Sequence, residues 1–237
     1  AFDHIVHDVA IQHLPVIFCM DRAGIAGEDG PTHHGSLDIA YLRCIQDMVV
    51  SAPRNGNEFR HLLYSALNQK ESPFSIRYPK SSAIDFDLDS QAELLPIGSW
   101  EVLRTGSDIV VLAVGPLSYN VERVAELLQN ENILIEIVNC RFIKPMDESY
   151  LRSLIERFNL VITIEEGVIV GGFGDGVSSW LLENNFQGRI KRLGLPDSFI
   201  QHGKRDELLS EIGLDENGII DTIKSLVNAT SDKLIET

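Results

Sequence analysis

Residues 15–45, PVIFCMDRAGIAGEDGPTHHGSLDIAYLRCI, join an apolar segment to a helical one through a loop rich in glycine, charge and histidine. The run PVIFCM at 15–20 is short and continuously apolar, which is typical of a strand buried on both faces of a parallel sheet. SLDIAYLRCI at 36–45 has helical spacing, with Ser36 as its candidate N-cap. A loop that only connects two elements does not need so many reactive side chains. The stretch therefore predicts a strand-loop-helix unit whose loop is functional.

Strand-like and helix-like segments alternate along the rest of the chain. The strand-like segments are 48–53, 73–79, 99–106, 108–115, 133–140, 160–167 and 189–196, and the helical ones are 57–69, 118–131, 147–158 and 174–184. Such alternation is typical of layered α/β architecture. We expect two layered α/β domains with mostly parallel sheets.

Residues 80–98, KSSAIDFDLDSQAELLPIG, interrupt this alternation. They have no sustained hydrophobic period, which indicates a segment that runs over the surface. We therefore expect a domain at 1–80, a linker at 81–97 and a second domain at 98–237. The chain also begins with a helical pattern that has no capping residue before it, so we expect it to be a piece of a longer protein.

Composition excludes several classes of partner. The chain has 237 residues, of which 44 % are apolar, and a formal net charge of -15. An acidic surface repels nucleic acid and anionic membranes, so we expect neither as a partner. No apolar run approaches the ~20 residues that a membrane span requires. A small anionic substrate is still compatible, because a local basic pocket can outweigh a distant negative surface.

The three cysteines, Cys19, Cys44 and Cys140, argue against a disulfide framework or a zinc site, because their number is odd and no CxxC pair occurs. Cys19 and Cys140 fall in apolar strand-like runs, so we expect both to be buried. This cysteine usage fits a reducing compartment, and we expect a cytoplasmic protein.

Four side chains suggest chemistry on an anionic ligand. Ligands of parallel α/β sheets bind beyond the carboxyl ends of strands, and Arg22 and Arg77 lie near two such ends. A guanidinium matches phosphate oxygens, and a histidine such as His33 suits proton transfer near neutral pH. Asp29 can accept a hydrogen bond from a substrate hydroxyl. A structural ion pair is the commoner role for an arginine after a strand, but the combination predicts an anion pocket shared by Arg22, Arg77 and His33.

Two further patterns resemble ligand sites less closely. His33 and His34 are adjacent, but neighbouring side chains point apart and no third ligand is suitably spaced, so we expect no metal ion there. Gly172, Gly174 and Gly176 spell G-x-G-x-G before a helix, without the full dinucleotide spacing. Two glutamates, at 165 and 166, precede this turn and would repel a pyrophosphate. Close helix–strand packing is the favoured explanation, and nucleotide binding is the weaker alternative.

A series of motifs, in order along nearly the whole chain, resembles one enzyme family. They lie at 7–45, 48–53, 75–79, 139–147, 163–177 and 193–203. The most specific is D-R-A-G followed by D-G-P-T-H-H-G, within 21–35. The chain resembles the carboxy-terminal part of the 1-deoxy-D-xylulose-5-phosphate synthases, a thiamine-diphosphate-dependent, transketolase-like family.

The resemblance implies an incomplete pyrimidine-binding domain in 1–80 and a transketolase-type carboxy-terminal domain in 98–237. It implies condensation of pyruvate with glyceraldehyde 3-phosphate and loss of CO2, in the biosynthesis of isoprenoid and thiamine precursors. By motif match, His33 is the active-site histidine, which transfers a proton or stabilises a developing alkoxide. Arg22 and Arg77 are the phosphate ligands and Asp29 contacts the substrate. Members of the family are dimers, so we expect a homodimer.

The family's thiamine diphosphate and Mg²⁺ depend on features that this chain lacks. These are the glutamate that protonates the aminopyrimidine ring, its aromatic platform, and the acidic G-D-G…N motif of an amino-terminal domain. We therefore expect no cofactor-binding or metal-binding residues here, and predict that the polypeptide alone is inactive without the missing amino-terminal domain. The alternative is a non-catalytic subunit or assembly module of a two-subunit transketolase-like complex.

Overall fold

The computed structural model describes the backbone of residues 1–235 and the side chains of residues 1–228. Its strands are β1 (Ile17–Met20), β2 (Val49–Ser51), β3 (Phe74–Arg77), β4 (Glu101–Arg104), β5 (Ile109–Ala113), β6 (Ile135–Asn139), β7 (Phe142–Lys144), β8 (Leu160–Val168) and β9 (Arg189–Leu195). Its helices are α1 (Phe2–His4), η1 (Ile5–Ala10), η2 (Gly27–Asp29), α2 (Asp38–Arg43), α3 (Gly56–Asn68), α4 (Leu117–Gln129), α5 (Glu148–Arg157), α6 (Phe173–Glu183), α7 (Arg205–Glu211) and α8 (Glu216–Ile235).

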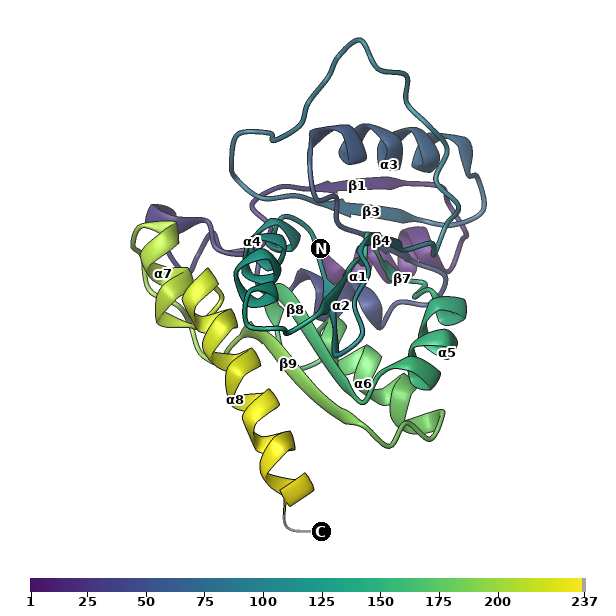
Figure 1. The fold of residues 1–237 in the computed structure, drawn as a ribbon. Helices are drawn as coiled ribbons and strands as arrows, with labels where there is room; N and C mark the ends of the chain where they lie inside the picture. The colour runs from purple at the N-terminus through teal and green to yellow at the C-terminus, as the bar shows by residue number, and fades with distance from the viewer. Residues whose placement is uncertain (236–237) are drawn as a thin grey trace.

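The strands form two sheets, which Figure 1 shows one above the other. The order is β1-β3-β2-β7 in the four-stranded sheet and β4-β6-β5-β8-β9 in the five-stranded sheet. All pairings are parallel except β2 with β7 and β4 with β6. The predicted α/β class with two mostly parallel sheets is confirmed.

β1 lies at the edge of the first sheet, where it pairs with β3 in the register Ile17↔Phe74 to Met20↔Arg77. The prediction that the 15–20 run is buried on both faces is wrong, because none of the four residues of β1 is fully buried and Cys19 is exposed. β3 takes the central position instead, and all four of its residues are buried. Cys140 is buried as predicted.

The helix α2 lies between the two sheets and contacts β2, β7 and β8. Its residues Ile39 and Leu42 belong to one buried cluster with Val50 of the first sheet and Val110 of the second. α2 begins at Asp38 after Leu37, and no side chain caps it, so the predicted cap at Ser36 is wrong. Burial on both sides, rather than a cap, therefore holds this short helix in place.

Two connections join the halves of the chain. β7 pairs antiparallel with β2, so residues 142–144 complete the first sheet. The predicted linker arches over α3 in Figure 1, and its backbone is held there by side chains of Arg60, His61 and Ser65. In the part of the chain described, no helix combines the length and hydropathy needed to cross a membrane. The domain boundaries at 80 and 98 stay a prediction.

Candidate functional site

The 21–37 loop leads from the carboxyl end of β1 to α2. Four of its residues have positive φ: Arg22 at 58°, Gly24 at 76°, Gly27 at 80° and Gly30 at 74°. Two backbone hydrogen bonds close the loop on itself, from Gly24 N to Gly35 O at 2.8 Å and from Gly35 N to Arg22 O at 2.9 Å. A side chain at position 35 would collide with the backbone of Arg22. Glycine is therefore required where the two branches of the loop meet.

Arg22, Asp29 and Lys80 form a charged cluster beyond the ends of β1 and β3. Lys80 Nζ lies 2.5 Å from Asp29 Oδ2, and Arg22 Nε lies 3.8 Å from the same oxygen. The hydrogen bond from Lys80 holds the pKa of Asp29 below its ordinary value. Arg22 also pairs with Asp21 at 2.7 Å through Nη1, while its Nε is shielded from solvent and has no hydrogen-bond acceptor among the described residues. The cluster therefore holds two cations whose donors are only partly engaged.

His33 and His34 have different surroundings, although they are adjacent. His34 Nδ1 accepts a hydrogen bond from Ala26 N at 3.0 Å, and its Nε2 lies 3.4 Å from Gln201 O. Both ring nitrogens of His34 thus contact backbone groups of the protein and stabilise the loop. His33 is exposed; its Nδ1 is hydrogen-bonded to the Thr32 hydroxyl at 2.9 Å, and its Nε2 has no partner within residues 1–228. His33 therefore presents one ring nitrogen to solvent, and its role in proton transfer stays a prediction.

Arg77 lies beneath the loop, 4 % exposed. Its Nε donates to Asp38 Oδ2 at 2.6 Å, and its Nη2 donates to Glu166 O at 2.9 Å and to Gly35 O at 3.2 Å. Burial favours the neutral form, but the neighbouring Asp38 carboxylate outweighs it and raises the pKa of Arg77. The expectation that both arginines are free to face one cavity is therefore corrected. Arg77 is an internal ion-pair partner, and only its Nη1 finds no acceptor among the described residues.

The glycine-rich 169–172 turn, between β8 and α6, is closed by the protein itself. Glu165 accepts hydrogen bonds from Phe173 N and Gly174 N, both at 2.8 Å, at the point where α6 begins. Arg43 Nη1 donates to the carbonyls of Gly171 and Gly172. A side chain at Gly174 would collide with Thr163. The prediction that these glycines serve close packing agrees with this geometry.

A phosphate at the start of α6 would meet the buried carboxylate of Glu165. Burial raises the pKa of Glu165 to about 7. The two backbone N–H groups and the charges of Arg77 and Arg43 lower this pKa, but burial has the larger effect. The residues described contain no group of three or more His, Cys, Asp or Glu side chains that could hold a metal ion. The start of α6, where Glu165 already takes the backbone N–H groups, thus does not fit a diphosphate.

Three side chains at the site were missed from the sequence. Lys80 follows the carboxyl end of β3 by three residues, and the strand-end rule that selected Arg22 applies to it equally. Glu166 and Arg205 contact the loop from the second sheet and from α7. Their separation from the loop by 141 and 180 residues leaves no local signal in the sequence.

Two family models match the chain. The model of the transketolase pyrimidine binding domain matches residues 1–84, and that of the transketolase C-terminal domain matches residues 98–219. Together they cover both sheets and the loop.

Curated relatives and a solved structure are similar over most of the chain. The 1-deoxy-D-xylulose-5-phosphate synthase of Aquifex aeolicus (strain VF5) is 47 % identical over 219 residues, or 92 % of this chain and 35 % of the relative. The synthase of Geobacillus sp. (strain WCH70) is 43 % identical over 228 residues, which are 96 % of this chain and 36 % of that relative. A split gene transketolase, described as an inactive beta4 tetramer, superposes with a TM-score of 0.81 at 25 % identity, covering 95 % of this chain and 70 % of that one. The chain spans about a third of the length of these curated relatives.

Proposed function

The chain belongs to the transketolase family, and from that premise we propose that it supplies the aldehyde-binding wall of a 1-deoxy-D-xylulose-5-phosphate synthase. The reaction is the condensation of pyruvate with glyceraldehyde 3-phosphate and release of CO2, with thiamine diphosphate and Mg²⁺ as cofactors. The observation that carries the proposal is identity of 42–47 % to synthases over more than nine-tenths of the chain. The split gene transketolase is only 25 % identical, so a non-catalytic subunit is not favoured.

The phosphate of the aldehyde would bind beside Arg22 and Lys80. Asp21 and Asp29 now offset these two cations, so an incoming phosphate has to take over donors that the carboxylates hold. A dianion attracts a guanidinium and an ammonium more strongly than one carboxylate does. The exchange would release Asp29 to accept a hydrogen bond from a substrate hydroxyl. For Arg77 we propose at most a contact through Nη1, because Asp38, Gly35 O and Glu166 O hold its other side-chain nitrogens.

His33 is the group proposed to move a proton. Its exposed Nε2 has no partner in the described part of the chain, while the Thr32 hydroxyl holds Nδ1. An imidazole fixed through one nitrogen presents the other in a defined direction. It would give a proton to the aldehyde oxygen as the new carbon–carbon bond forms, so that no free alkoxide accumulates.

These 237 residues are proposed to be inactive by themselves, because they span only about a third of the length of the synthases that they match. The test is to assay the purified 237-residue chain and the complete protein with pyruvate, glyceraldehyde 3-phosphate, thiamine diphosphate and Mg²⁺. We expect CO2 release by the complete protein and none above background by the chain alone. Turnover by the chain alone would overturn the division of labour, and absence of turnover by the complete protein would overturn the synthase assignment.

Two coarser expectations accompany the proposal. Leu37, Val170 and Phe199 are large hydrophobic side chains that are more than half exposed, which fits a surface covered in a homodimer. Light scattering of the complete protein would give its oligomeric state directly. A cytoplasmic location is proposed with it, because three widely spaced cysteines without a CxxC pair fit a reducing compartment.

A further inference from the structure

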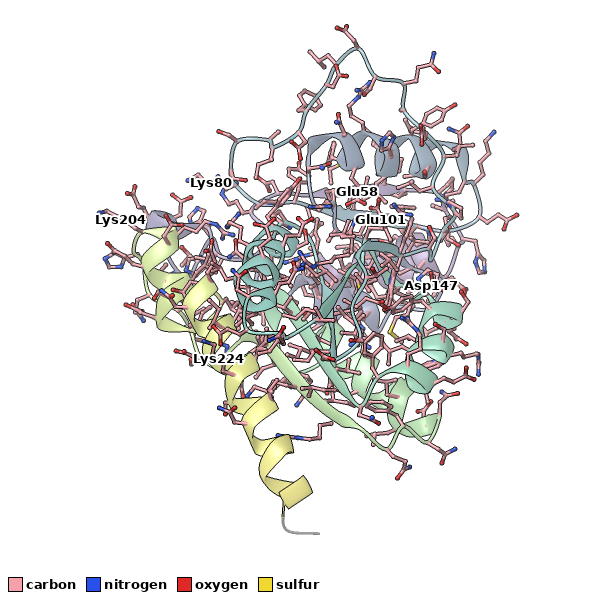
Figure 2. All side chains as sticks on the ribbon, in the orientation of Figure 1. Glu58, Lys80, Glu101, Asp147, Lys204 and Lys224 are labelled. Carbon is pink, nitrogen blue, oxygen red and sulfur yellow. The ribbon has the colours of Figure 1, made fainter. Side chains whose placement is uncertain are left out.

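One residue of the 21–37 loop is buried in the core of the other half of the molecule. Ile25 is 1 % exposed and packs in the cluster that contains Ile109 of β5 and Leu208 and Leu209 of α7. The loop follows a strand of the first sheet, but its side-chain anchor lies against the second. Figure 1 shows η2, in purple, beside α7, and Figure 2 labels Lys80 on that same side of the molecule.

The backbone of Ile25 is held at both of its polar groups by one ion pair. Ile25 N donates to Glu166 Oε2 at 3.1 Å, and Arg205 Nη1 donates to Ile25 O at 3.0 Å. Arg205 Nη1 also donates to Glu166 Oε2 at 2.7 Å, and the second guanidinium nitrogen pairs with Oε1. Glu166 is buried near the end of β8, and Arg205 is the first residue of α7. The Glu166–Arg205 pair thus binds both backbone polar groups of one loop residue, Ile25.

The same strand also holds the opposite branch of the loop. The carbonyl of Glu166 accepts a hydrogen bond from Arg77, whose Nη2 also donates to Gly35 O. Gly24, next to Ile25, leaves no room for a side chain, because an added Cβ would overlap the Glu166 carboxylate. The positive φ of Arg22 is a costly conformation for a residue with a side chain, and it persists only where surrounding contacts impose it.

We propose that the Glu166–Arg205 pair is a positioning pair, which fixes Ile25 and so sets where Arg22 and His33 stand for a phosphorylated ligand. Arg22 lies three residues before Ile25 along the strained branch, and His33 lies on the branch that closes onto it. Neither Glu166 nor Arg205 needs to touch the ligand. The identity of the ligand rests on the proposed function, whereas the anchoring of the loop does not.

The test uses the complete protein with Arg205→Met, which removes the hydrogen bonds of the guanidinium and keeps an apolar stem. Arg192→Met is the matched control, because Arg192 pairs with Asp175 at 2.6 Å on β9 and α6, away from the loop. Hydrogen exchange of residues 21–37 is followed by mass spectrometry, and affinity for glyceraldehyde 3-phosphate and for inorganic phosphate by calorimetry without pyruvate. We expect Arg205→Met to speed exchange in the loop and to weaken both ligands by about tenfold or more, with the control unchanged.

Two additional variants separate positioning from folding. Arg205→Met leaves the Glu166 carboxylate buried without its partner, so the double variant Glu166→Gln with Arg205→Met is measured beside it; it carries no unpaired charge and still offers an acceptor to Ile25 N. We expect the double variant to recover thermal stability but not ligand affinity. Arg205→Lys, which keeps a donor near Ile25 O, should recover part of the affinity. In steady-state assays, the KM for glyceraldehyde 3-phosphate should rise and the KM for pyruvate should not.

Unchanged loop exchange in Arg205→Met would overturn the anchoring. Faster loop exchange with unchanged affinity for both ligands would overturn the positioning role. If the unaltered protein binds neither glyceraldehyde 3-phosphate nor phosphate, the proposed function fails, and the exchange data still decide whether the pair anchors the loop.

Discussion

The 21–37 loop and the 169–172 turn both lead from a parallel strand to a helix through several glycines. In the first, His33 Nε2 and Arg22 Nε have no hydrogen-bond partner among the described residues, and Arg22 Nε lies 3.8 Å from Asp29 Oδ2. In the second, Glu165 takes the N–H groups at the start of α6, and Arg43 takes the carbonyls before it. Glycine in such a connection shows only that the backbone needs room. Whether a ligand can bind depends on which donors the protein leaves unengaged.

The largest difference is expected between the two adjacent histidines of the loop. His33→Asn in the complete enzyme removes Nε2 and should lower kcat by about 10²- to 10⁴-fold, as loss of a general acid–base group does. His34→Asn is the matched control, because the asparagine oxygen can still accept the hydrogen bond of Ala26 N. We expect it to lower kcat by much less. Equal losses in both variants would contradict the role of His33.

Substitution of Arg77 should lower the stability of the protein much more than substitution of Arg22. Arg77→Met leaves Asp38 buried without a partner, which costs about 3–5 kcal/mol in unfolding free energy. Arg22 pairs at the surface, where an ion pair contributes roughly 0–1 kcal/mol, so Arg22→Met should leave the thermal midpoint nearly unchanged. Calorimetry of both variants checks this. A similar midpoint for the two would mean that the Arg77–Asp38 pair is not an internal anchor.

Glu165 should make the closed turn sensitive to pH. Its pKa is raised from 4.5 to about 7, so the folded protein binds more protons than the unfolded chain in that window. Its contribution to stability is therefore fully present below pH 4.5 and is lost as pH rises through 7, a total of about 3 kcal/mol.

Glu165→Gln lacks this titration. The stability of the unaltered protein relative to the variant should fall from pH 5 to pH 8, as measured by thermal midpoints at both values. If the difference in thermal midpoint between the unaltered protein and Glu165→Gln is the same at both pH values, the burial of a titrating carboxyl at this position is contradicted.

Gly174→Ala tests how closely α6 packs against β8 directly after the 169–172 turn. The new methyl would meet the side chain of Thr163, which is buried and stiff, so we expect a loss of about 1–3 kcal/mol in stability. The KM for glyceraldehyde 3-phosphate should not change, because we do not expect the 169–172 turn to contact the aldehyde. A raised KM with unchanged stability would move the turn into the binding site.

The local pattern of the sequence was sufficient for the fold class, whereas the roles that it assigned to the loop residues stay predictions. Alternating apolar runs predicted the parallel sheets, and the loop chemistry selected Arg22, Asp29 and His33. What failed depended on tertiary position. The period of the 15–20 run does not reveal that β1 lies at an edge, so Cys19 was predicted to be buried. Nothing near Lys144 indicates that β7 crosses to the first sheet.

Arg77 shows the same limit at the level of a single side chain. A strand-end arginine can face a ligand or an internal carboxylate, and the choice here depends on Asp38, which is 39 residues away. The contacts of Glu166 and Arg205 with Ile25 join residues that are still farther apart in the sequence, by 141 and 180 positions. Ion pairs that join distant segments are therefore the part of the site that required coordinates.

The central claim is that the 21–37 loop recognises the phosphate of an aldehyde through Arg22. The most direct measurement compares kcat/KM for glyceraldehyde 3-phosphate and for unphosphorylated glyceraldehyde in the complete enzyme and in Arg22→Met. Losing a charge-assisted hydrogen bond worth about 1.5–3 kcal/mol should reduce the preference for the phosphorylated substrate by about 10- to 100-fold. Glyceraldehyde itself and the KM for pyruvate should be nearly unaffected. An equal loss of kcat/KM for both aldehydes would contradict the claim.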